Sequence, residues 1–121
     1  MKPKKNIHKP LNLTAIILTY NEEIHIQRCV KSIIDIVDEI VIVDSYSTDK
    51  TIQKLKKLKK IRIFKNKFIN QAKQINWALH NVKFSTQWIL RIDADEYFTK
   101  TLKEKIIIKL KNKQKNFSGI S

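Results

Sequence analysis

Short apolar runs along this chain alternate with longer segments in which apolar residues recur every three or four positions. The short runs predict β-strands, and the periodic segments predict amphipathic helices. The predicted strands cover residues 13–18, 39–43, 61–64 and 88–92. The predicted helices cover residues 22–36, 50–60 and 70–81, and a last one runs from a cap at Thr99 or Thr101 to residue 111. This alternation is typical of an α/β fold with a mostly parallel sheet and right-handed crossovers.

The apolar positions also predict which residues are buried. The third helix is expected to bury Ala72, Ile75, Ala78, Leu79 and Val82. The last helix is expected to bury Leu102, Ile106 and Leu110. Because the first strand is almost wholly apolar, helices are expected on both faces of the sheet. The chain then divides into a flexible basic arm at 1–11, one domain at 12–111 and a polar tail at 112–121.

Charge narrows the classes of partner. Lys and Arg number 25 against 11 Asp and Glu among 121 residues, which gives a formal net charge of +14. A strongly basic chain attracts nucleic acid or anionic membranes. Here the lysines are scattered, and aromatic residues do not interleave with them as a base-stacking surface requires. We therefore favour solvated basic faces over a specific nucleic-acid-binding surface.

The single cysteine and the length of the apolar runs indicate the cellular compartment that we expect. Cys29 has no partner for an intrachain disulfide and no companions for a zinc site. We therefore expect an inert thiol on a helix, in a reducing, cytoplasmic setting. The apolar runs are too short for a membrane span, and the run at 11–18 is broken by Asn12 and Thr14, which argues against a signal peptide.

Three of the predicted strands end in polar clusters. The clusters are Thr19-Tyr20-Asn21-Glu22, Asp44-Ser45-Tyr46-Ser47-Thr48-Asp49 and Asp93-Ala94-Asp95-Glu96. The carboxyl ends of parallel strands share one edge of the sheet, where ligands bind in open α/β folds. In an extended segment Asp93 and Asp95 would point the same way, and two carboxylates suit Mg²⁺ or Mn²⁺ shared with substrate phosphates. The alternative is that these acids only form turns and cap helices.

The chain contains one Gly and no glycine-rich phosphate loop, so the dinucleotide-binding and P-loop interpretations fail. A nucleotide would instead be held by an aromatic ring, an acid and a metal, which Tyr20, Asp44 and Asp95 can supply. Asp44 could alternatively cap the next helix, and Asp49 is expected to do so. The remaining candidates are expected to have no site role: His8, His25 and His80 belong to no cluster, and Trp77 and Trp88 are expected in the core.

Four segments resemble those of family 2 glycosyltransferases, in the same order. They are AIILTYNEE at 15–23, IVDSYSTDKT at 42–51, QAKQINWAL at 71–79 and IDADE at 92–96. The most similar subgroup is the lipopolysaccharide-core β-glycosyltransferases, which are often glucosyltransferases. The resemblance covers about residues 13–111. It implies a Rossmann-like GT-A fold, here the nucleotide-sugar-binding half domain, and an inverting transfer that uses a nucleotide-diphosphate sugar, expected to be a UDP-sugar, and a divalent metal.

By position, the resemblance also implies roles for single residues. The nucleoside pocket would be lined by Thr19, Tyr20 and Glu22. Asp44 would hydrogen-bond the base, and Lys73 would approach the donor. Asp93 would contact the ribose or sugar of the donor, and Asp95 would ligate the metal together with Asp93. The acceptor is expected to be a glycan or lipid-linked, which would bring the protein to the cytoplasmic face of the inner membrane.

The family's catalytic base lies well after the Asp-x-Asp element, on a later segment that also binds the acceptor, whereas this sequence ends soon after Asp95. We therefore expect a truncated donor-binding half with very low activity of its own. Its uncovered sheet edge would favour oligomers. Two alternatives stay open: a nucleotide-sugar-binding remnant without turnover, and a basic nucleic-acid-binding protein.

Overall fold

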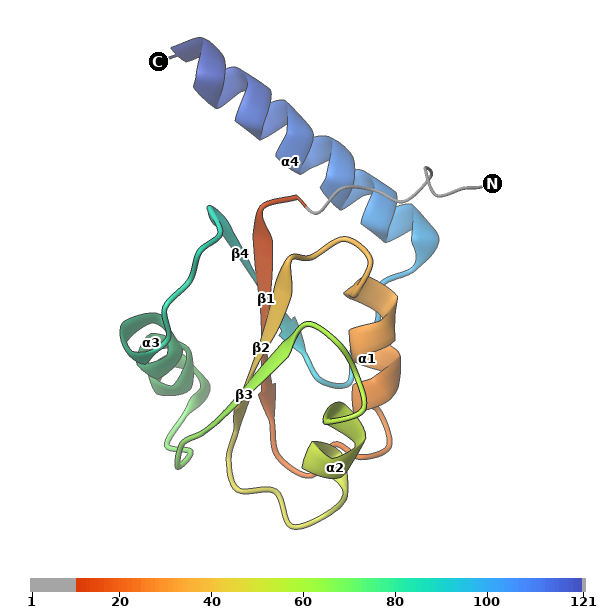
Figure 1. Cartoon of the computed structure of the whole chain (residues 1–121), viewed down its shortest axis with the longest axis vertical. Helices are drawn as coiled ribbons and strands as arrows, with labels where there is room; N and C mark the ends of the chain where they lie inside the picture. Colours follow the sequence, from red (N-terminus) through yellow and green to blue (C-terminus); the bar gives the residue numbers. More distant parts are fainter. Residues whose placement is uncertain (1–10, 121) are drawn as a thin grey trace.

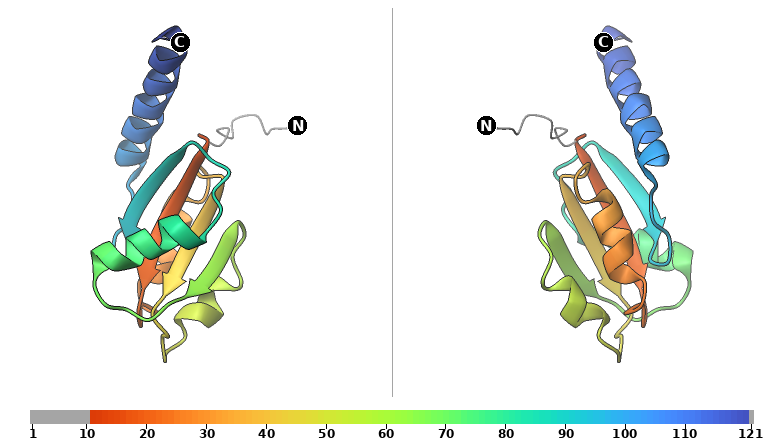
Figure 2. Two further views of the ribbon diagram at one scale, coloured as in Figure 1. Left: turned by 90° about the vertical axis from the view of Figure 1, so that its left-hand side faces the viewer. Right: turned by 90° about the vertical axis from the view of Figure 1, so that its right-hand side faces the viewer.

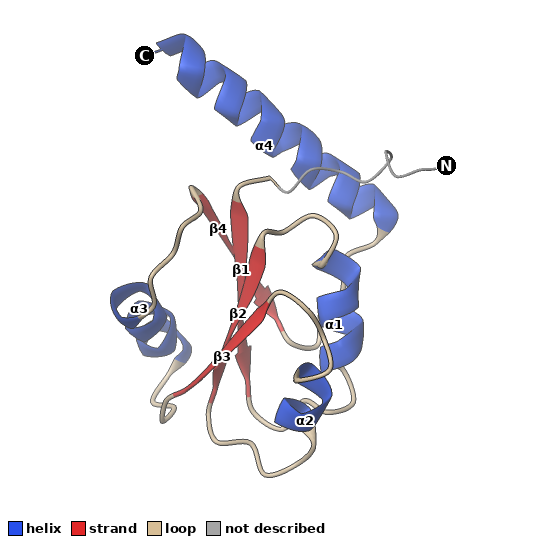
Figure 3. Ribbon diagram, viewed as in Figure 1, coloured by secondary structure: helices blue, strands red, loops and turns tan. Residues whose placement is uncertain are grey.

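The computed structural model describes residues 11–120, with side chains described for residues 11–113. Its strands are β1 (Leu13–Thr19), β2 (Glu39–Asp44), β3 (Ile61–Lys65) and β4 (Trp88–Asp93). Its helices are α1 (Ile26–Ile33), α2 (Thr51–Leu55), α3 (Gln71–Asn81) and α4 (Lys100–Ile120). Strands and helices alternate along the chain, as the sequence predicts (Figure 1 and Figure 3).

The strands form one parallel sheet in the order β3-β2-β1-β4. In this sheet β1 lies between β2 and β4, with Thr19 opposite Asp44 and Leu18 opposite Asp93. Because the strands run in one direction with matched ends, the polar segments that follow β1, β2 and β4 meet at one edge. The convergence expected from the sequence is therefore confirmed.

Alternation along β1 divides the core between the two faces of the sheet. On one face Ala15 and Ile17 pack in a cluster with buried residues of α1, α2 and α4. On the other face Ile16 packs with Ala78 of α3 and with Val82. Figure 2 shows the result, with α3 on one side of the sheet and α1 and α2 on the other. The expected α/β fold, with a parallel sheet and helices on both faces, is confirmed.

The first two helices are shorter than predicted. The segment after β1 begins with a turn, in which the N–H of Ile26 donates to the Glu22 carbonyl at 2.9 Å, before α1 proper starts. Helix α2 ends at Leu55. The lysine-rich stretch that follows turns instead of continuing the helix, because Lys60 takes a left-handed φ of 66° and its carbonyl accepts the Ile40 N–H at 2.8 Å. Pairing with the entry to β2 thus overrides the helical spacing of this stretch.

The buried face of α3 differs from the predicted one. Ala72 is exposed, and Leu79 is 46% exposed. The positions that are buried are Gln74, Ala78 and Val82, which stand four residues apart. Residues four apart share one helix face, and Leu79 lies about 100° around the helix from Ala78. Ile75, Ala78 and Val82 thus pack as expected, while the buried Gln74 takes the place predicted for Ala72 and Leu79 and turns the contact face partway around the helix.

Helix α4 is longer than predicted. The expected end at residue 111 is wrong, and residues 112–120 continue the helix instead of forming a tail. No Pro or Gly interrupts the sequence before Gly119, so nothing stops helix propagation. Figure 1 shows α4 leading away from the sheet along most of its length.

The beginning of α4 packs on the sheet through a face close to the predicted one. Ile106 and Leu110 pack against the core, as expected, but Leu102 is 41% exposed and Ile107 is buried in its place. Thr99 is the cap, since its hydroxyl oxygen accepts the Leu102 N–H at 3.2 Å.

Residues 1–10 of the expected basic arm lie outside the described residues. Leu11, which the sequence placed in that arm, belongs instead to the core and is 4% exposed, with its N–H donating to the Ile36 carbonyl at 3.4 Å. Among the residues that the structure describes, no helix is both long and apolar enough to cross a membrane.

Candidate functional site

Asp44 is the last residue of β2 and precedes the loop that borders the site. Its side chain is fully buried. One carboxylate oxygen accepts the hydroxyl protons of Thr19 at 2.7 Å and Ser47 at 2.6 Å, and the other accepts the Ser47 N–H at 2.7 Å. Asp44 therefore organises the loop after β2 in the described conformation. A base could reach its carboxylate only after residues 45–48 moved, so the expected hydrogen bond to the base stays a prediction.

Asn21 joins the loop after β1 to the loop after β2. Its φ of 53° is left-handed, which Asn tolerates better than most residues. Its side-chain oxygen accepts the N–H groups of Thr48 at 2.8 Å and Asp49 at 3.2 Å, while its own N–H donates to the Ser47 hydroxyl at 2.8 Å. No role for Asn21 was predicted from the sequence. The signal for one was an Asn directly after a strand end, where a left-handed residue can bond a neighbouring loop.

Asp49 stabilises the start of α2 by accepting a backbone hydrogen bond there, as predicted. Its carboxylate accepts the N–H of Thr51 at 2.9 Å and the N–H of Glu23 at 3.2 Å. Loss of surrounding water raises the pKa of this carboxyl, but the hydrogen bonds from Thr51 and Glu23 outweigh it, and the net pKa is below the ordinary value. Asp49 is thus a structural acid that the protein itself keeps ionised.

A hollow of about 450 Å³ opens beside these loops, lined by Tyr20, Ser45, Lys67 and Phe68. A smaller hollow of about 130 Å³ adjoins it and shares Tyr20, Ser45 and Phe68. Glu22 and the buried Thr19 also line the smaller hollow. The structure therefore brings the three residues predicted for the nucleoside pocket to one place.

The structure adds two features of this region that the sequence did not predict, one at Phe68 and one at Gln74. Phe68 lies in the loop between β3 and α3 and is 47% exposed, although it is aromatic. Gln74 is buried, and its amide nitrogen donates to the Ser45 hydroxyl at 3.2 Å and to the Asn66 carbonyl at 3.0 Å. An aromatic residue in a lysine-rich loop was the available signal for Phe68. Gln74 belongs to the segment 71–79 that resembles the glycosyltransferases, on the helix expected to approach the donor. Its burial was not predicted, because a helix normally turns such a side chain to solvent.

The acids after β4 are arranged differently from the prediction. The chain does not stay extended through Asp93 and Asp95 but turns at Ala94, and the N–H of Glu96 donates to the Asp93 carbonyl at 2.9 Å. The alternation argument for two parallel carboxylates therefore does not apply. All three acids are exposed, and the Glu96 carboxylate accepts the Asp93 N–H at 2.9 Å.

The charge of Asp95 acts on Glu22, in the loop after β1. Burial raises the pKa of the Glu22 carboxyl above its ordinary value, and the negative charges of Asp95 and Asp49 raise it further, while His25 lowers it. No hydrogen bond or ion pair with another described residue engages the Asp95 carboxylate. The Asp93 carboxylate lies 3.8 Å from the Arg91 guanidinium, a distance at the limit of an ion pair.

These carboxylates fit a divalent cation that is shared with a ligand. Within the described part of the chain, no group of three or more His, Cys, Asp and Glu side chains could enclose a metal ion. Asp95 and Glu22 offer two hard oxygen donors whose mutual repulsion a cation would relieve. Mg²⁺ commonly takes one or two carboxylates and fills its other positions with water and substrate phosphates. The residues therefore suit such an ion without forming a complete cage.

Lys73 is exposed on α3 and lines a different hollow of about 320 Å³, together with Trp77 and His80. Lys67 lines both this hollow and the Tyr20 hollow. The structure thus places Lys73 next to the candidate site but not among the residues that line the Tyr20 hollow. The approach of Lys73 to a donor stays a prediction.

Cys29 lies beneath the acids and is buried on α1, as expected. Its Sγ donates to the Asp93 carbonyl at 3.6 Å. Burial, together with the negative charges of Glu96, Asp95, Asp93 and Glu22, raises the pKa of this thiol to about 12. A thiol held protonated in this way is a poor nucleophile, which confirms the expectation of an inert cysteine.

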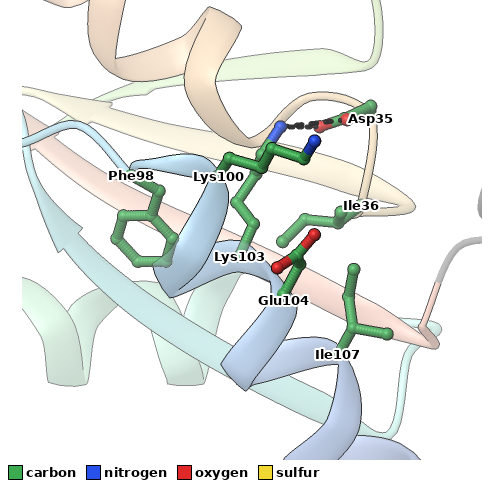
Figure 4. Close-up of a pocket in the computed structure, with 7 residues that line it drawn as sticks. All are labelled: Asp35, Ile36, Phe98, Lys100, Lys103, Glu104 and Ile107. Atoms are coloured by element: carbon green, nitrogen blue, oxygen red, sulfur yellow. Dashed lines mark hydrogen bonds and ion pairs between the residues drawn. The ribbon is translucent and has the colours of Figure 1, made fainter.

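Another hollow, of about 360 Å³, lies away from the strand ends between the α1–β2 connection and the start of α4 (Figure 4). An ion pair between Lys103 and Asp35 at 3.0 Å crosses it. Its lining mixes Lys100 and Glu104 with the apolar Ile36, Phe98 and Ile107. Because Lys103 and Asp35 already pair with each other there, we take the strand-end edge as the candidate site.

Comparison with known proteins assigns the chain a family. The model of the family described as "Glycosyl transferase family 2" matches residues 14–120. An uncharacterized glycosyltransferase of Rickettsia bellii is 36% identical over 94 residues, which cover 78% of this chain and 31% of that protein. The lipopolysaccharide core biosynthesis glycosyltransferase LpsC of Rhizobium meliloti is 37% identical over 98 residues, or 78% of this chain and 35% of LpsC.

Among solved structures, that of S. aureus TarS 1–349 matches 78% of this chain and 31% of its own, with a TM-score of 0.58 and 30% sequence identity. Together with the parallel sheet, this likeness confirms the expected GT-A-type fold. The chain spans about a third of the length of the relatives it matches.

Proposed function

This chain belongs to glycosyl transferase family 2, and from that membership we propose that residues 11–120 bind the donor of an inverting sugar transfer. The donor is a nucleotide-diphosphate sugar, with UDP as the nucleotide. One observation carries the proposal: an aromatic hollow lies at the same sheet edge as Glu22 and the exposed Asp95, whose negative charge raises the Glu22 pKa. Such an edge has room for a nucleoside at one end and a metal-bound diphosphate at the other.

The nucleoside end lies over β2 and β1. Tyr20, 56% exposed, offers its ring to a base, and the Ser45 hydroxyl offers a hydrogen bond in the same hollow. Thr19 and Asp44 are buried beneath and act through the loop they hold. At this end the protein would therefore bind the nucleoside by stacking and by the shape of the hollow, because Thr19 and Asp44 already hydrogen-bond within the protein.

The diphosphate end lies over β4, where Asp95, Asp93 and Glu22 would hold a divalent cation, Mg²⁺ or Mn²⁺. Bound there, such a cation would supply the positive charge that stabilises a diphosphate leaving group. The carboxylates also keep the donor sugar of a bound nucleotide at the β4 side of the edge. No residue of this chain is assigned the role of base toward the acceptor.

The proposed acceptor is a glycan or lipid-linked sugar of a lipopolysaccharide core, by analogy with the relative named for lipopolysaccharide core biosynthesis. A net charge of +14 favours approach to an anionic leaflet, where a lipid-linked acceptor is presented. The same charge suits nucleic acid, but the exposed Asp93, Asp95 and Glu96 at the site repel phosphate unless a cation intervenes. The charge pattern therefore favours sugar transfer over nucleic-acid binding.

The proposal is tested by calorimetric titration of UDP into the protein, with Mn²⁺ and with a chelator. We expect binding in Mn²⁺ that weakens at least about tenfold with the chelator and in Asp95→Asn. Glu104→Gln, which removes an exposed acid on α4, serves as the matched control and should bind as the wild type does. Absence of UDP binding under every condition would contradict donor binding by this chain. UDP binding without sugar transfer in the presence of acceptor would identify a binding remnant.

A further inference from the structure

The hollow beside Tyr20 has a second aromatic wall, which comes from a different part of the chain. Phe68 lines both adjoining hollows together with Tyr20 and Ser45, although it follows β3 and they follow β1 and β2. We propose that Phe68 is a base-contacting residue of this site and that the nucleobase lies against both rings, Tyr20 and Phe68. This inference rests on the proposed donor binding and assigns it a further specificity residue.

The exposure of Phe68 is not explained by packing. Phe68 is 47% exposed and belongs to neither core cluster of the described residues. The next residue, Ile69, is 66% exposed but lines the hollow on the outer side of α3. Of the two adjacent apolar side chains, only Phe68 therefore faces the hollow that contains Tyr20. A flat apolar ring held half in water is suited to cover a flat ligand.

The loop that carries Phe68 is held in place. The side-chain nitrogen of Asn66 donates to the Gln74 side-chain oxygen at 2.8 Å, and the Gln74 nitrogen returns a hydrogen bond to the Asn66 carbonyl at 3.0 Å. The N–H of Asn66 donates to the Asp44 carbonyl at 3.0 Å, and Gln74 also donates to Ser45 at 3.2 Å. The loop that carries Phe68 is thus tied through the buried Gln74 amide to Ser45, which also lines the hollow.

The order of the strands decides which part of the ligand meets Phe68. The loop after β3 lies at the far side of the sheet from β4, in the order β3-β2-β1-β4. The carboxylates that suit a diphosphate follow β4 and β1, so a ligand laid along the edge presents its other end to the loop after β3. That end is the base.

The test compares Phe68→Ala with Phe68→Tyr and with the matched control Ile69→Ala, by calorimetry in Mn²⁺. Two probes are used: UDP, and inorganic pyrophosphate, which lacks a base. We expect Phe68→Ala to weaken UDP binding by about 5- to 100-fold, as loss of one stacking ring does, and to leave pyrophosphate binding unchanged. Phe68→Tyr and Ile69→Ala should bind both probes within about twofold of the wild type. The melting temperature of Phe68→Ala should match the wild type because Phe68 lies outside the core.

The outcomes separate this inference from the proposal beneath it. Wild-type UDP binding that persists undiminished in Phe68→Ala would overturn the role of Phe68 and leave donor binding intact. Equal loss of UDP and pyrophosphate binding in Phe68→Ala would also overturn it, because the loop would then act on the whole site. Failure of the wild type to bind either probe would overturn the donor site itself.

Discussion

The two ends of the candidate site are built in opposite ways. At the β1–β2 end, each polar group of Asp44 and Asn21 is engaged by the neighbouring loop, and Asp44 is fully buried. At the β4 end, Asp93 and Asp95 are exposed, and Asp95 has no hydrogen-bonding partner among the described residues. The first end is completed by the protein, and the second is left to be completed by a ligand.

This difference shows how one edge of the sheet can hold a rigid loop and also keep acids free to bind a ligand. A buried carboxylate with several donors fixes a loop, because leaving any of those donors unpaired is costly. Exposed carboxylates without such donors, such as that of Asp95, stay available to a cation. Acids of the same type, at or just beyond the ends of strands in one sheet, therefore have different tasks. Substitutions should separate these tasks as a loss of stability at one end and a loss of binding at the other.

The largest effect on stability is expected for Asp44→Ala. It leaves the hydroxyl of Thr19 and both donors of Ser47 without their buried acceptor. We expect the free energy of unfolding to fall by about 3 kcal/mol, measured by urea denaturation. The matched control is Asp93→Ala at the exposed end, with an expected change below about 0.5 kcal/mol. Equal destabilisation by both substitutions would remove the contrast between the two ends.

A smaller effect is expected where the two ends meet, at Glu22. Its pKa is raised above the ordinary value of 4.5 by burial and by Asp95. A raised folded-state pKa means that the stability contributed by the protonated carboxyl is fully present below pH 4.5 and is lost as the pH rises through the folded-state pKa. Glu22→Gln does not titrate, so it should melt slightly higher than the wild type at pH 7 and at the same temperature at pH 3.

Thermal melts of Glu22→Gln at both pH values check this expectation. Glu104→Gln, the exposed substitution on α4, measures the general effect of removing one negative charge from a chain of net charge +14. If Glu104→Gln raises the melting temperature at pH 7 as much as Glu22→Gln does, net charge is responsible, and not the repulsion between Glu22 and Asp95. A gain that persists at pH 3 would contradict the proposed repulsion.

The sequence predicts the strands and their order along the chain well, because short apolar runs between polar clusters are strong local signals. Helix ends are predicted less well. Lys60 ends the α2 region through a left-handed turn and a hydrogen bond to Ile40, a contact between distant segments that no local pattern contains. The burial of Gln74 depends likewise on Asn66 and Ser45, which come near it only in the folded chain.

For the site, the sequence predicts which loops meet better than it predicts the burial and backbone conformation of their residues. The meeting of Tyr20 after β1 and Ser45 after β2 at one edge follows from parallel topology and could be predicted. The enclosure of Asp44 could not, because it depends on the Ser47 donors folding back over it. The turn at Ala94, which replaces an extended Asp-x-Asp, could not be predicted from spacing either.

The most direct test of the account separates the two ends with two ligands, uridine and UDP, each titrated calorimetrically with and without Mn²⁺. The account predicts that uridine binds equally in both conditions, because the Tyr20 end is complete without metal. It predicts that Mn²⁺ strengthens UDP binding at least about tenfold and that Asp95→Asn removes that gain alone. Metal-dependent binding of uridine, or UDP binding that Mn²⁺ does not change, would contradict the division of the site into a protein-built end and a ligand-completed end.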